Sequence, residues 1–356
     1  MWKANPIASR LQVKWPIIQA GMAGGTTTPE LVAAVSAAGG LGTLGAGYMS
    51  AEQIRQAIRA IRELTDKPFA VNLFIPEEFD GEQPVASTVA IAMNDVRERL
   101  GIPADPAVTR YAEPFAEQMA VVIEEQVPVF SFTFGMLEPR WMAELKQRGV
   151  TVVGTATTVR EAVALEASGV DMIAAQGSEA GGHRGSFLPD SPSNLVGTMA
   201  LVPQIVDRVN IPVIAAGGIM DGRGIAAAFA LGAQAVQLGT AFLTCVESGA
   251  HPEYKRAVRE TNDEATVITR AFSGKSARGI ENEFMTLLAP HDSELPPYPV
   301  QNALTRDIRT AAAKQNRTEY LSLWAGQAAF LSRGLRAEEL VAKLVEETER
   351  VVSGLR

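Results

Sequence analysis

Eight short apolar runs recur along the first two thirds of this chain, and each precedes a segment with the pattern of a helix. Strands that are apolar along their whole length are typical of parallel sheets buried on both faces. The runs are residues 16–20, 39–47, 69–74, 129–135, 150–155, 171–176, 211–216 and 234–240. Eight successive β/α units predict a (β/α)8 barrel, the TIM-barrel fold. A doubly wound open sheet is the alternative, and the unchanged pattern through all eight units favours closure.

The segments outside this repeat predict a second, smaller unit. The connection 75–106 is rich in Pro, Glu and Asp, and we expect it to hold a helix at 85–100 and to lie over the barrel mouth. A helix is expected at 106–125. Beyond Glu247 the chain becomes more charged and contains several prolines. We therefore predict a barrel at 1–247, a smaller, mainly helical domain at 248–334 leaning on the barrel's C-terminal face, and a closing C-terminal helix within 335–356.

Composition excludes several classes of function. The net charge of −8, without a Lys/Arg cluster, argues against a nucleic-acid partner. The single cysteine, Cys245, rules out an intrachain disulfide and is expected to fill the core, and no Cys-x-x-Cys pair is present. No metal site is expected. The N-terminus lacks the apolar core of a signal peptide, and no run reaches the roughly 18 apolar residues of a membrane span. We expect a cytoplasmic protein, a monomer or small homo-oligomer, that binds neither membrane nor nucleic acid.

A glycine-rich segment follows the sixth apolar run and carries the main catalytic candidate. Gln176 ends the run, and Gly181 and Gly182 lead into His183, one of three histidines in the chain. Strands of a parallel barrel present reactive groups at their carboxyl ends and in the loops that follow. A glycine-rich surface loop with an incidental histidine is the alternative. His251 and His291 lie in polar segments with Gly and Pro, where a surface position is expected.

Two further glycine loops predict a phosphate site after the seventh and eighth strands. Gly217 and Gly218 end the seventh strand before the helix that starts at 221–224, and Gln237, Leu238, Gly239 and Thr240 end the eighth. Barrel enzymes bind phosphate at this position, where glycine lets the backbone approach and helix N–H groups point at the anion. Tight strand-to-helix turns are the alternative for each loop.

A flavin mononucleotide (FMN) fits these loops better than a dinucleotide. FMN has one phosphate and a flat ring, whose polar edge needs amides such as Asn72 and Gln176 at strand ends. Satisfied core amides are the alternative. The segment 40–45 matches the pattern G-x-G-x-x-G but lies inside the second strand, so a nicotinamide-binding unit is not expected. Residues 273–276, around Lys275, lack the glycine spacing and preceding strand of a phosphate loop.

These motifs resemble those of the nitronate monooxygenase family, and in particular its class I. The resemblance rests on residues 16–20 with 22–24, 132–135, 175–185, and 216–219 with 221–224. It implies a flavoenzyme that oxidises alkyl nitronates, including propionate 3-nitronate, with O2 to a carbonyl compound and nitrite. It further implies that His183 is catalytic and that Tyr298 belongs to a segment closing the substrate pocket. FMN would be bound by Asn72, Gln176, Gly181, Gly218, Gln237, Leu238, Gly239 and Thr240.

The reaction requires few catalytic groups from the protein, because a nitronate is already a carbanion equivalent. His183 can hydrogen-bond the nitronate oxygens, and it could serve as general base toward neutral nitroalkanes because the reference pKa of histidine lies near the working pH. The same motifs occur in flavin-dependent enoyl-acyl-carrier-protein reductases. An FMN- and NAD(P)H-dependent enoyl or quinone reductase is therefore the alternative, and a non-catalytic flavin-binding barrel is another. The segments around Tyr298 and 317–324 favour the monooxygenase.

Overall fold

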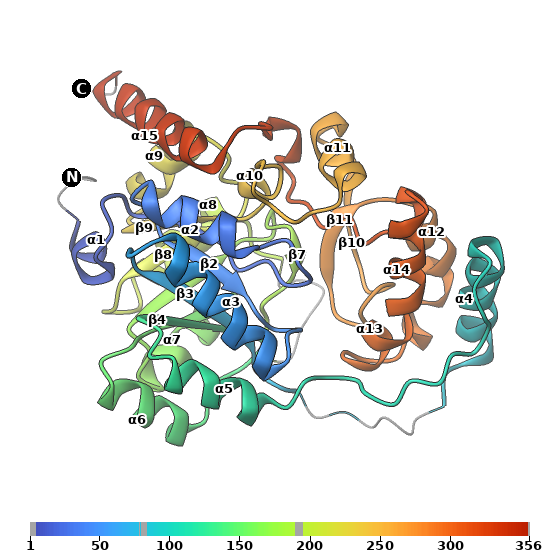
Figure 1. Ribbon diagram of the computed structural model, residues 1–356. Coiled ribbons are helices and arrows are strands. Elements are labelled where there is room, and N and C mark those ends of the chain that lie inside the picture. Colours follow the sequence, from blue (N-terminus) through green and yellow to red (C-terminus); the bar gives the residue numbers. More distant parts are fainter. Residues whose placement is uncertain (1–4, 78, 80–83, 189–194, 355–356) are drawn as a thin grey trace.

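The strands close into a barrel in the computed structural model, which describes residues 5–77, 79, 84–188 and 195–354 (Figure 1). Their order around the sheet is β1-β9-β8-β6-β5-β4-β3-β2, and neighbours pair in parallel. A parallel bridge between Ile18 and Leu41 joins the two ends of this order. The strands are β1 (Ile17–Gln19), β2 (Gly42–Gly45), β3 (Phe69–Phe74), β4 (Val129–Thr133), β5 (Thr151–Ala156), β6 (Met172–Gln176), β8 (Val213–Ala216) and β9 (Ala235–Leu238). The predicted TIM barrel is confirmed.

Helices connect the strands and cover the outside of the barrel. They are α2 (Pro29–Ala37), α3 (Ala51–Leu64), α5 (Phe115–Glu124), α6 (Pro139–Gln147), α7 (Val159–Ala167), α8 (Thr198–Val206) and α9 (Gly222–Ala230). Their starts follow the sequence signals, since Ser50 and Gln53 form a complete capping box at α3. The helix expected at 106–125 is shorter than predicted. It begins only at Phe115, after Pro114, where proline favours extended backbone before a first turn.

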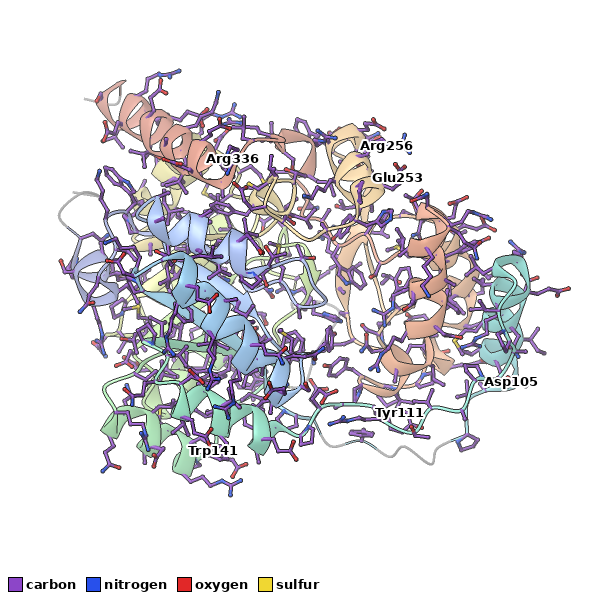
Figure 2. The ribbon with its side chains drawn as sticks, viewed as in Figure 1. Asp105, Tyr111, Trp141, Glu253, Arg256 and Arg336 are labelled. Atoms are coloured by element: carbon purple, nitrogen blue, oxygen red, sulfur yellow. The ribbon has the colours of Figure 1, made fainter. Side chains whose placement is uncertain are left out.

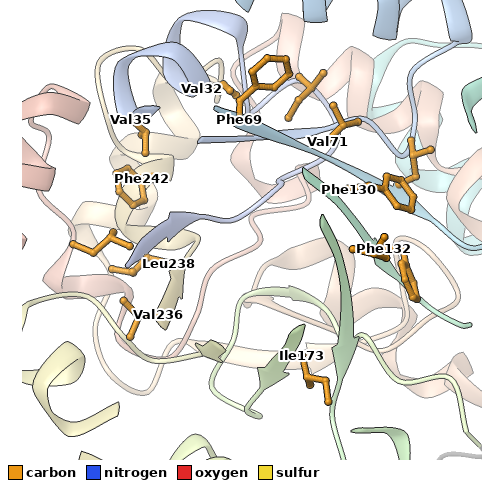
Figure 3. Close-up of a cluster of buried hydrophobic side chains, with 14 of the residues drawn as sticks. Val32, Val35, Phe69, Val71, Phe130, Phe132, Ile173, Val236, Leu238 and Phe242 are labelled. Carbon is orange, nitrogen blue, oxygen red and sulfur yellow. The ribbon is translucent and has the colours of Figure 1, made fainter. Parts of the chain in front are cut away.

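Two apolar layers hold the barrel together. Between strands and helices, Val32 and Val35 of α2 belong to one buried cluster with Phe69 and Val71 of β3 and with Phe130 (Figure 3). A second cluster fills the barrel interior with side chains from the inner faces of the strands. It is completed by Ile7 and Leu11 of the N-terminal helix α1 (Pro6–Leu11), which are 1% and 2% exposed. This packing leaves the carboxyl ends of the strands as the open end.

The glycines of β2 serve close packing. A Cβ at Gly42 would overlap the carbonyl oxygen of Val32 in α2, and one at Gly45 would lie 2.5 Å from the carbonyl carbon of Met22. The segment 40–45 is a barrel strand paired with β1 and β3. The prediction that this segment lies in the second strand is confirmed.

A second group of elements packs beside the carboxyl ends of the strands (Figure 1). It contains a small antiparallel sheet in which the loop strand β7 (Gly182–His183) pairs with β11 (Ala277–Ile280), and β11 pairs with β10 (Thr266–Thr269). The helices of this group are α11 (Pro252–Glu260), α12 (Glu283–Leu288), α13 (Val300–Leu304) and α14 (Arg306–Lys314), with short 3-10 turns at 289–294, 318–320 and 329–331.

The connection after β3 joins this second group. Its helix α4 (Ser87–Leu100) was predicted, but the expected position over the barrel mouth is wrong: α4 packs against α12 and α14. Val89 and Val96 share a buried cluster with Phe284. Arg97, 2% exposed, anchors α4 through an ion pair between its Nε and Asp307 Oδ2 at 2.8 Å. The apolar face of α4 is thus covered by the second group of elements and not by the barrel.

The closing helix α15 (Ala337–Gly354) returns to the barrel and packs on α9 and α2. Glu247 connects the start of this helix to the end of the barrel, because Ala337 N donates to Glu247 Oε2 at 2.9 Å and Arg336 pairs with Glu247 Oε1 at 3.3 Å. Figure 2 labels Arg336 at the start of the helix. The closing helix predicted within 335–356 is present, and the domain boundaries at 247 and 334 stay predictions. Across the described residues, no helix combines the length and apolarity that crossing a bilayer requires.

Candidate active site

A cavity of about 540 Å³ lies at the carboxyl ends of the barrel strands, with the second group of elements forming part of its wall. Most of the residues predicted from the sequence line it: Asn72, Gln176, Gly181, His183, Gly218, Gln237, Leu238, Gly239 and Thr240. Tyr298 lies behind this wall, 8% exposed, with its ring 5.9 Å from that of His183. The structure therefore gathers the candidates around one space, and Tyr298 contacts the catalytic candidate.

The glycine loops form one side of the cavity. Gly217 and Gly218 follow β8 with φ of 113° and 72°, backbone conformations that favour glycine. Gly239 opens the short helix α10 (Thr240–Leu243), whose first N–H groups receive no side-chain cap. The Thr240 hydroxyl accepts a hydrogen bond from Gly326 N at 3.0 Å, which leaves its own proton available to an anion.

The helix after β8, α9, was predicted to point its first N–H groups at a phosphate, but these groups have partners within the protein. Asp221 caps α9 by accepting from Arg223 N at 2.9 Å, and its carboxylate also pairs with the Arg223 side chain. Gly222 N donates to Glu347 of α15 at 3.2 Å. The first N–H groups of α9 are thus used within the protein. Gly218 and the start of α10 remain as the places where a phosphate could bind.

The strand-end amides differ in what they already bind. Asn72 Nδ2 donates to Ser131 Oγ at 2.9 Å. Gln176 is used twice by the loop after its own strand: its Nε2 donates to His183 O at 3.0 Å, and its Oε1 accepts from Gly185 N at 2.8 Å. Gln176 therefore positions the segment that carries His183. The Gln237 amide has no hydrogen-bond partner within the described part of the chain.

His183 is held among aromatic rings as a neutral imidazole. Its ring centroid lies 5.6 Å from Phe134 and 5.5 Å from Trp324, and its Nε2 lies 2.8 Å from Ser273 Oγ. Burial, together with the positive charges of Lys275 and Arg309, lowers the pKa of His183 to about 3. The expectation of a general base with a pKa near the working pH is therefore wrong, because such an imidazole takes up a proton only weakly.

Several residues at the site were not predicted from the sequence. Lys275, set aside as part of a false phosphate loop, lies 4.9 Å above the Phe134 ring and pairs with Glu77 Oε1 at 2.6 Å. His251, expected at the surface, lines the cavity, and its Nδ1 accepts from Glu253 N at 3.2 Å as the cap of α11. A pattern search overlooks such residues because each comes alone from a different segment. Cys245 is buried as predicted.

The charge of the cavity wall is positive. Arg309 lines it, with Lys275 close behind, and among the described residues no Asp or Glu lines it. No group of three or more His, Cys, Asp or Glu side chains in the described part of the chain could hold a metal ion. A neutral imidazole and uncompensated positive charge suit a substrate that is already an anion.

Comparisons with known proteins agree with this geometry. The family model described as nitronate monooxygenase matches residues 5–347. A probable nitronate monooxygenase of Staphylococcus saprophyticus is 46% identical, covering 98% of each chain, and one of Staphylococcus haemolyticus is 45% identical, covering 100% of each.

Solved structures show the same architecture. A nitroalkane oxidase from Streptomyces ansochromogenes superimposes with a TM-score of 0.88 at 40% identity, covering 98% of this chain and 100% of its own. FabK from Thermotoga maritima gives a TM-score of 0.78 at 34% identity, covering 99% and 98%. The match of the family model over nearly the whole chain, together with these full-length relatives, shows that the chain belongs to the nitronate monooxygenase family.

Proposed function

We propose that this oxidoreductase binds FMN and oxidises alkyl nitronates such as propionate 3-nitronate with O2, giving a carbonyl compound and nitrite. The observation that carries the proposal is that a neutral His183 lies in a cavity with a positively charged wall. Among the described residues, no Asp or Glu side chain lines this cavity. A nitronate arrives already deprotonated, so its oxidation needs no strong base. A neutral nitroalkane would need one, and an imidazole with a pKa of about 3 is poorly suited to that task.

The glycine loops and strand-end amides support FMN as the cofactor. Gly218, Gly239 and Thr240 would hold the phosphate, since glycine backbone and a free hydroxyl proton are what a phosphate needs. Asn72, Gln176 and Gln237 lie at strand ends along the same cavity and would face the ring. A Cβ at Gly181 would lie 2.5 Å from Gly326 N, so glycine there keeps two loops of the wall in contact. When bound, FMN supplies the electron acceptor of the reaction.

Ser273 would determine which proton His183 offers to the substrate. The Ser273 hydroxyl has one proton and two possible acceptors, His183 Nε2 at 2.8 Å and the Lys275 carbonyl oxygen at 3.1 Å. We propose that the hydroxyl donates its proton to the nearer acceptor, His183 Nε2, in which case the hydrogen of the neutral imidazole is carried by Nδ1. Nδ1 has no hydrogen-bond partner among the described residues, so it is available to donate to a nitronate oxygen. His183 would thus bind and orient the anion.

An enoyl or quinone reductase that uses NAD(P)H is the second candidate. The likeness to FabK over the whole chain favours it. The two functions differ in what reduces the flavin. Rapid anaerobic bleaching of the yellow protein by NADH, with none by a nitronate, would support the reductase and overturn the proposal.

The direct test is to mix the aerobic holoenzyme with propionate 3-nitronate and measure nitrite. We expect His183→Asn to retain FMN and to lose turnover by roughly 100-fold or more, the scale of a lost catalytic side chain. His291→Asn, at a partly exposed histidine in the 3-10 turn 289–294, is the matched control and should keep wild-type rates. Unchanged turnover in His183→Asn would remove His183 from the mechanism. A yellow protein inert to nitronates, quinones and enoyl thioesters would indicate a non-catalytic flavin-binding barrel.

A further inference from the structure

Arg309 of α14 lines the cavity, and one nitrogen of its guanidinium makes no hydrogen bond to the described residues. Its Nε donates to Thr305 O at 3.3 Å, and its Nη2 donates to Asn302 O at 2.6 Å and Asn302 Oδ1 at 3.0 Å. These bonds fix the side chain against the end of α13. Within the described part of the chain, Nη1 has no hydrogen-bond partner and no carboxylate pairs with this arginine.

Lys275 beside the cavity has an ion-pair partner, whereas Arg309 has none among the described residues. Lys275 pairs with Glu77 at 2.6 Å. Asp307, two residues before Arg309, gives its carboxylate to Arg97 of α4, with oxygen–nitrogen distances of 2.8 and 3.4 Å. Burial lowers the pKa of Arg309, but a guanidinium stays charged in proteins. A half-buried cation without an ion-pair partner is costly, so this wall of the cavity gains stability when an anion binds.

Arg309 and His183 both line the cavity but reach it from different elements. His183 is carried by β7, whereas Arg309 comes from α14 of the second group of elements. Tyr48 lies beside it: burial raises the pKa of Tyr48, and the positive charge of Arg309 opposes this rise. A substrate held by His183 at its reacting end can therefore present a second polar end to Arg309.

We propose that Arg309 binds a carboxylate on the substrate, at the end remote from the nitronate group, and so selects nitronates that carry an acidic tail. This inference rests on the proposed function. The planar guanidinium with a free Nη1 suits a carboxylate oxygen, since charge-assisted hydrogen bonds of this kind are strong and directional. Arg309 acts as a specificity-determining residue, because the tail it binds does not react.

The experiment compares two nitronates in the holoenzyme: propionate 3-nitronate, with a carboxylate, and propyl-1-nitronate, without one. Arg309→Gln keeps hydrogen-bond donors for Asn302 and removes the charge. We expect it to lower kcat/KM for the carboxylated substrate by roughly 30-fold or more, mainly through KM, and to change the other substrate by less than about threefold. Arg309→Lys keeps the charge and should recover much of the loss. Lys314→Met, at an exposed cation of the same helix, is the matched control.

Binding without turnover gives an independent measurement. Calorimetric titration of the holoenzyme with 3-nitropropionate should give a Kd that rises by a similar factor in Arg309→Gln, while thermal unfolding verifies that the variant is folded. Equal losses on both nitronates, or no loss on either, would overturn the assignment. If the wild-type holoenzyme oxidises neither nitronate, the proposed function fails first, and the calorimetric comparison still decides whether Arg309 binds a carboxylate.

Discussion

His183 illustrates how its neighbours, more than its own chemistry, decide what a residue does. A free histidine titrates near neutrality, but here aromatic rings and two nearby cations hold the imidazole uncharged. Under the proposed function, Ser273 then determines which nitrogen carries the proton. The same side chain in a solvated loop would be a base. In this cavity it is a neutral hydrogen-bonding group.

The first prediction concerns the pH dependence of stability. Because the folded pKa of His183, about 3, lies below the unfolded value near 6.5, the unfolded chain binds more protons between these values, and stability falls as the pH is lowered through this window. At pH 4.5 this group alone costs roughly 2–3 kcal/mol relative to pH 7. Urea unfolding of the holoenzyme and of His183→Gln at both pH values measures it. The wild type should lose more stability than the variant, and identical losses would mean that His183 is not held neutral.

The second prediction concerns Ser273, which is 1% exposed. Ser273→Ala removes the hydrogen bond that selects the His183 tautomer, and we expect kcat/KM for nitronates to fall roughly 10-fold with FMN retained. Without Ser273, both tautomers of the His183 imidazole become accessible. We therefore expect the activity toward a neutral nitroalkane to fall less than the activity toward the corresponding nitronate. Ser273→Thr should restore the wild-type ratio. Ser276→Ala, in the same loop and without a side-chain hydrogen bond in the described structure, is the control. A uniform loss on both substrates would indicate a merely structural role.

At the scale of elements, the loop after β8 depends on backbone that only glycine adopts readily. Gly218→Ala would strain a residue at φ 72° and bring its Cβ to 3.3 Å from Glu179 Cβ. We expect weaker FMN binding, by roughly 10-fold, measured by fluorescence titration of the apoprotein. Gly101→Ala is the matched control, because Gly101 has a similar φ of 66°, open space around it and a place at the end of α4. Equal FMN affinities in the two variants would mean that Gly218 does not contribute to FMN binding.

The barrel was predictable from sequence because each strand lies in a mainly apolar run that is followed by a helix, and α2, α3, α7 and α9 begin with a side-chain cap. The small sheet was not, since β7 has only two residues, and β10 and β11 mix apolar residues with Thr, Arg and Gly and so form no continuous apolar run. The sequence likewise predicted α4 but not the helices against which it packs, because an apolar helix face does not indicate which element covers it. The glycine motifs located most cavity residues. Arg309 and Ser273 carry no motif, and only their packing brings them to His183.

At the scale of the whole molecule, the cavity joins the barrel to the second group of elements. The barrel loop that carries His183 pairs as β7 with β11, so one hydrogen-bonded sheet spans both parts. Gly326 N donates to Thr240 at the end of β9, and Gln327 N donates to the Glu179 carbonyl oxygen at 3.0 Å. A ligand in this space would contact both parts, which makes its binding a contribution to the stability of the whole fold.

Removal of the flavin should therefore lower the stability of the entire chain. Under the proposed function, FMN at 100 times its Kd adds about 2.7 kcal/mol to the free energy of unfolding, enough to raise Tm by several degrees in a chain of this size. Thermal unfolding of the apoprotein with and without FMN measures this, and riboflavin, which lacks the phosphate, is the control. Riboflavin should stabilise less, because Gly218, Gly239 and Thr240 are expected to bind the phosphate. Equal stabilisation by the two flavins would mean that the phosphate lies outside these loops, and no stabilisation by either would rule out flavin binding in the cavity.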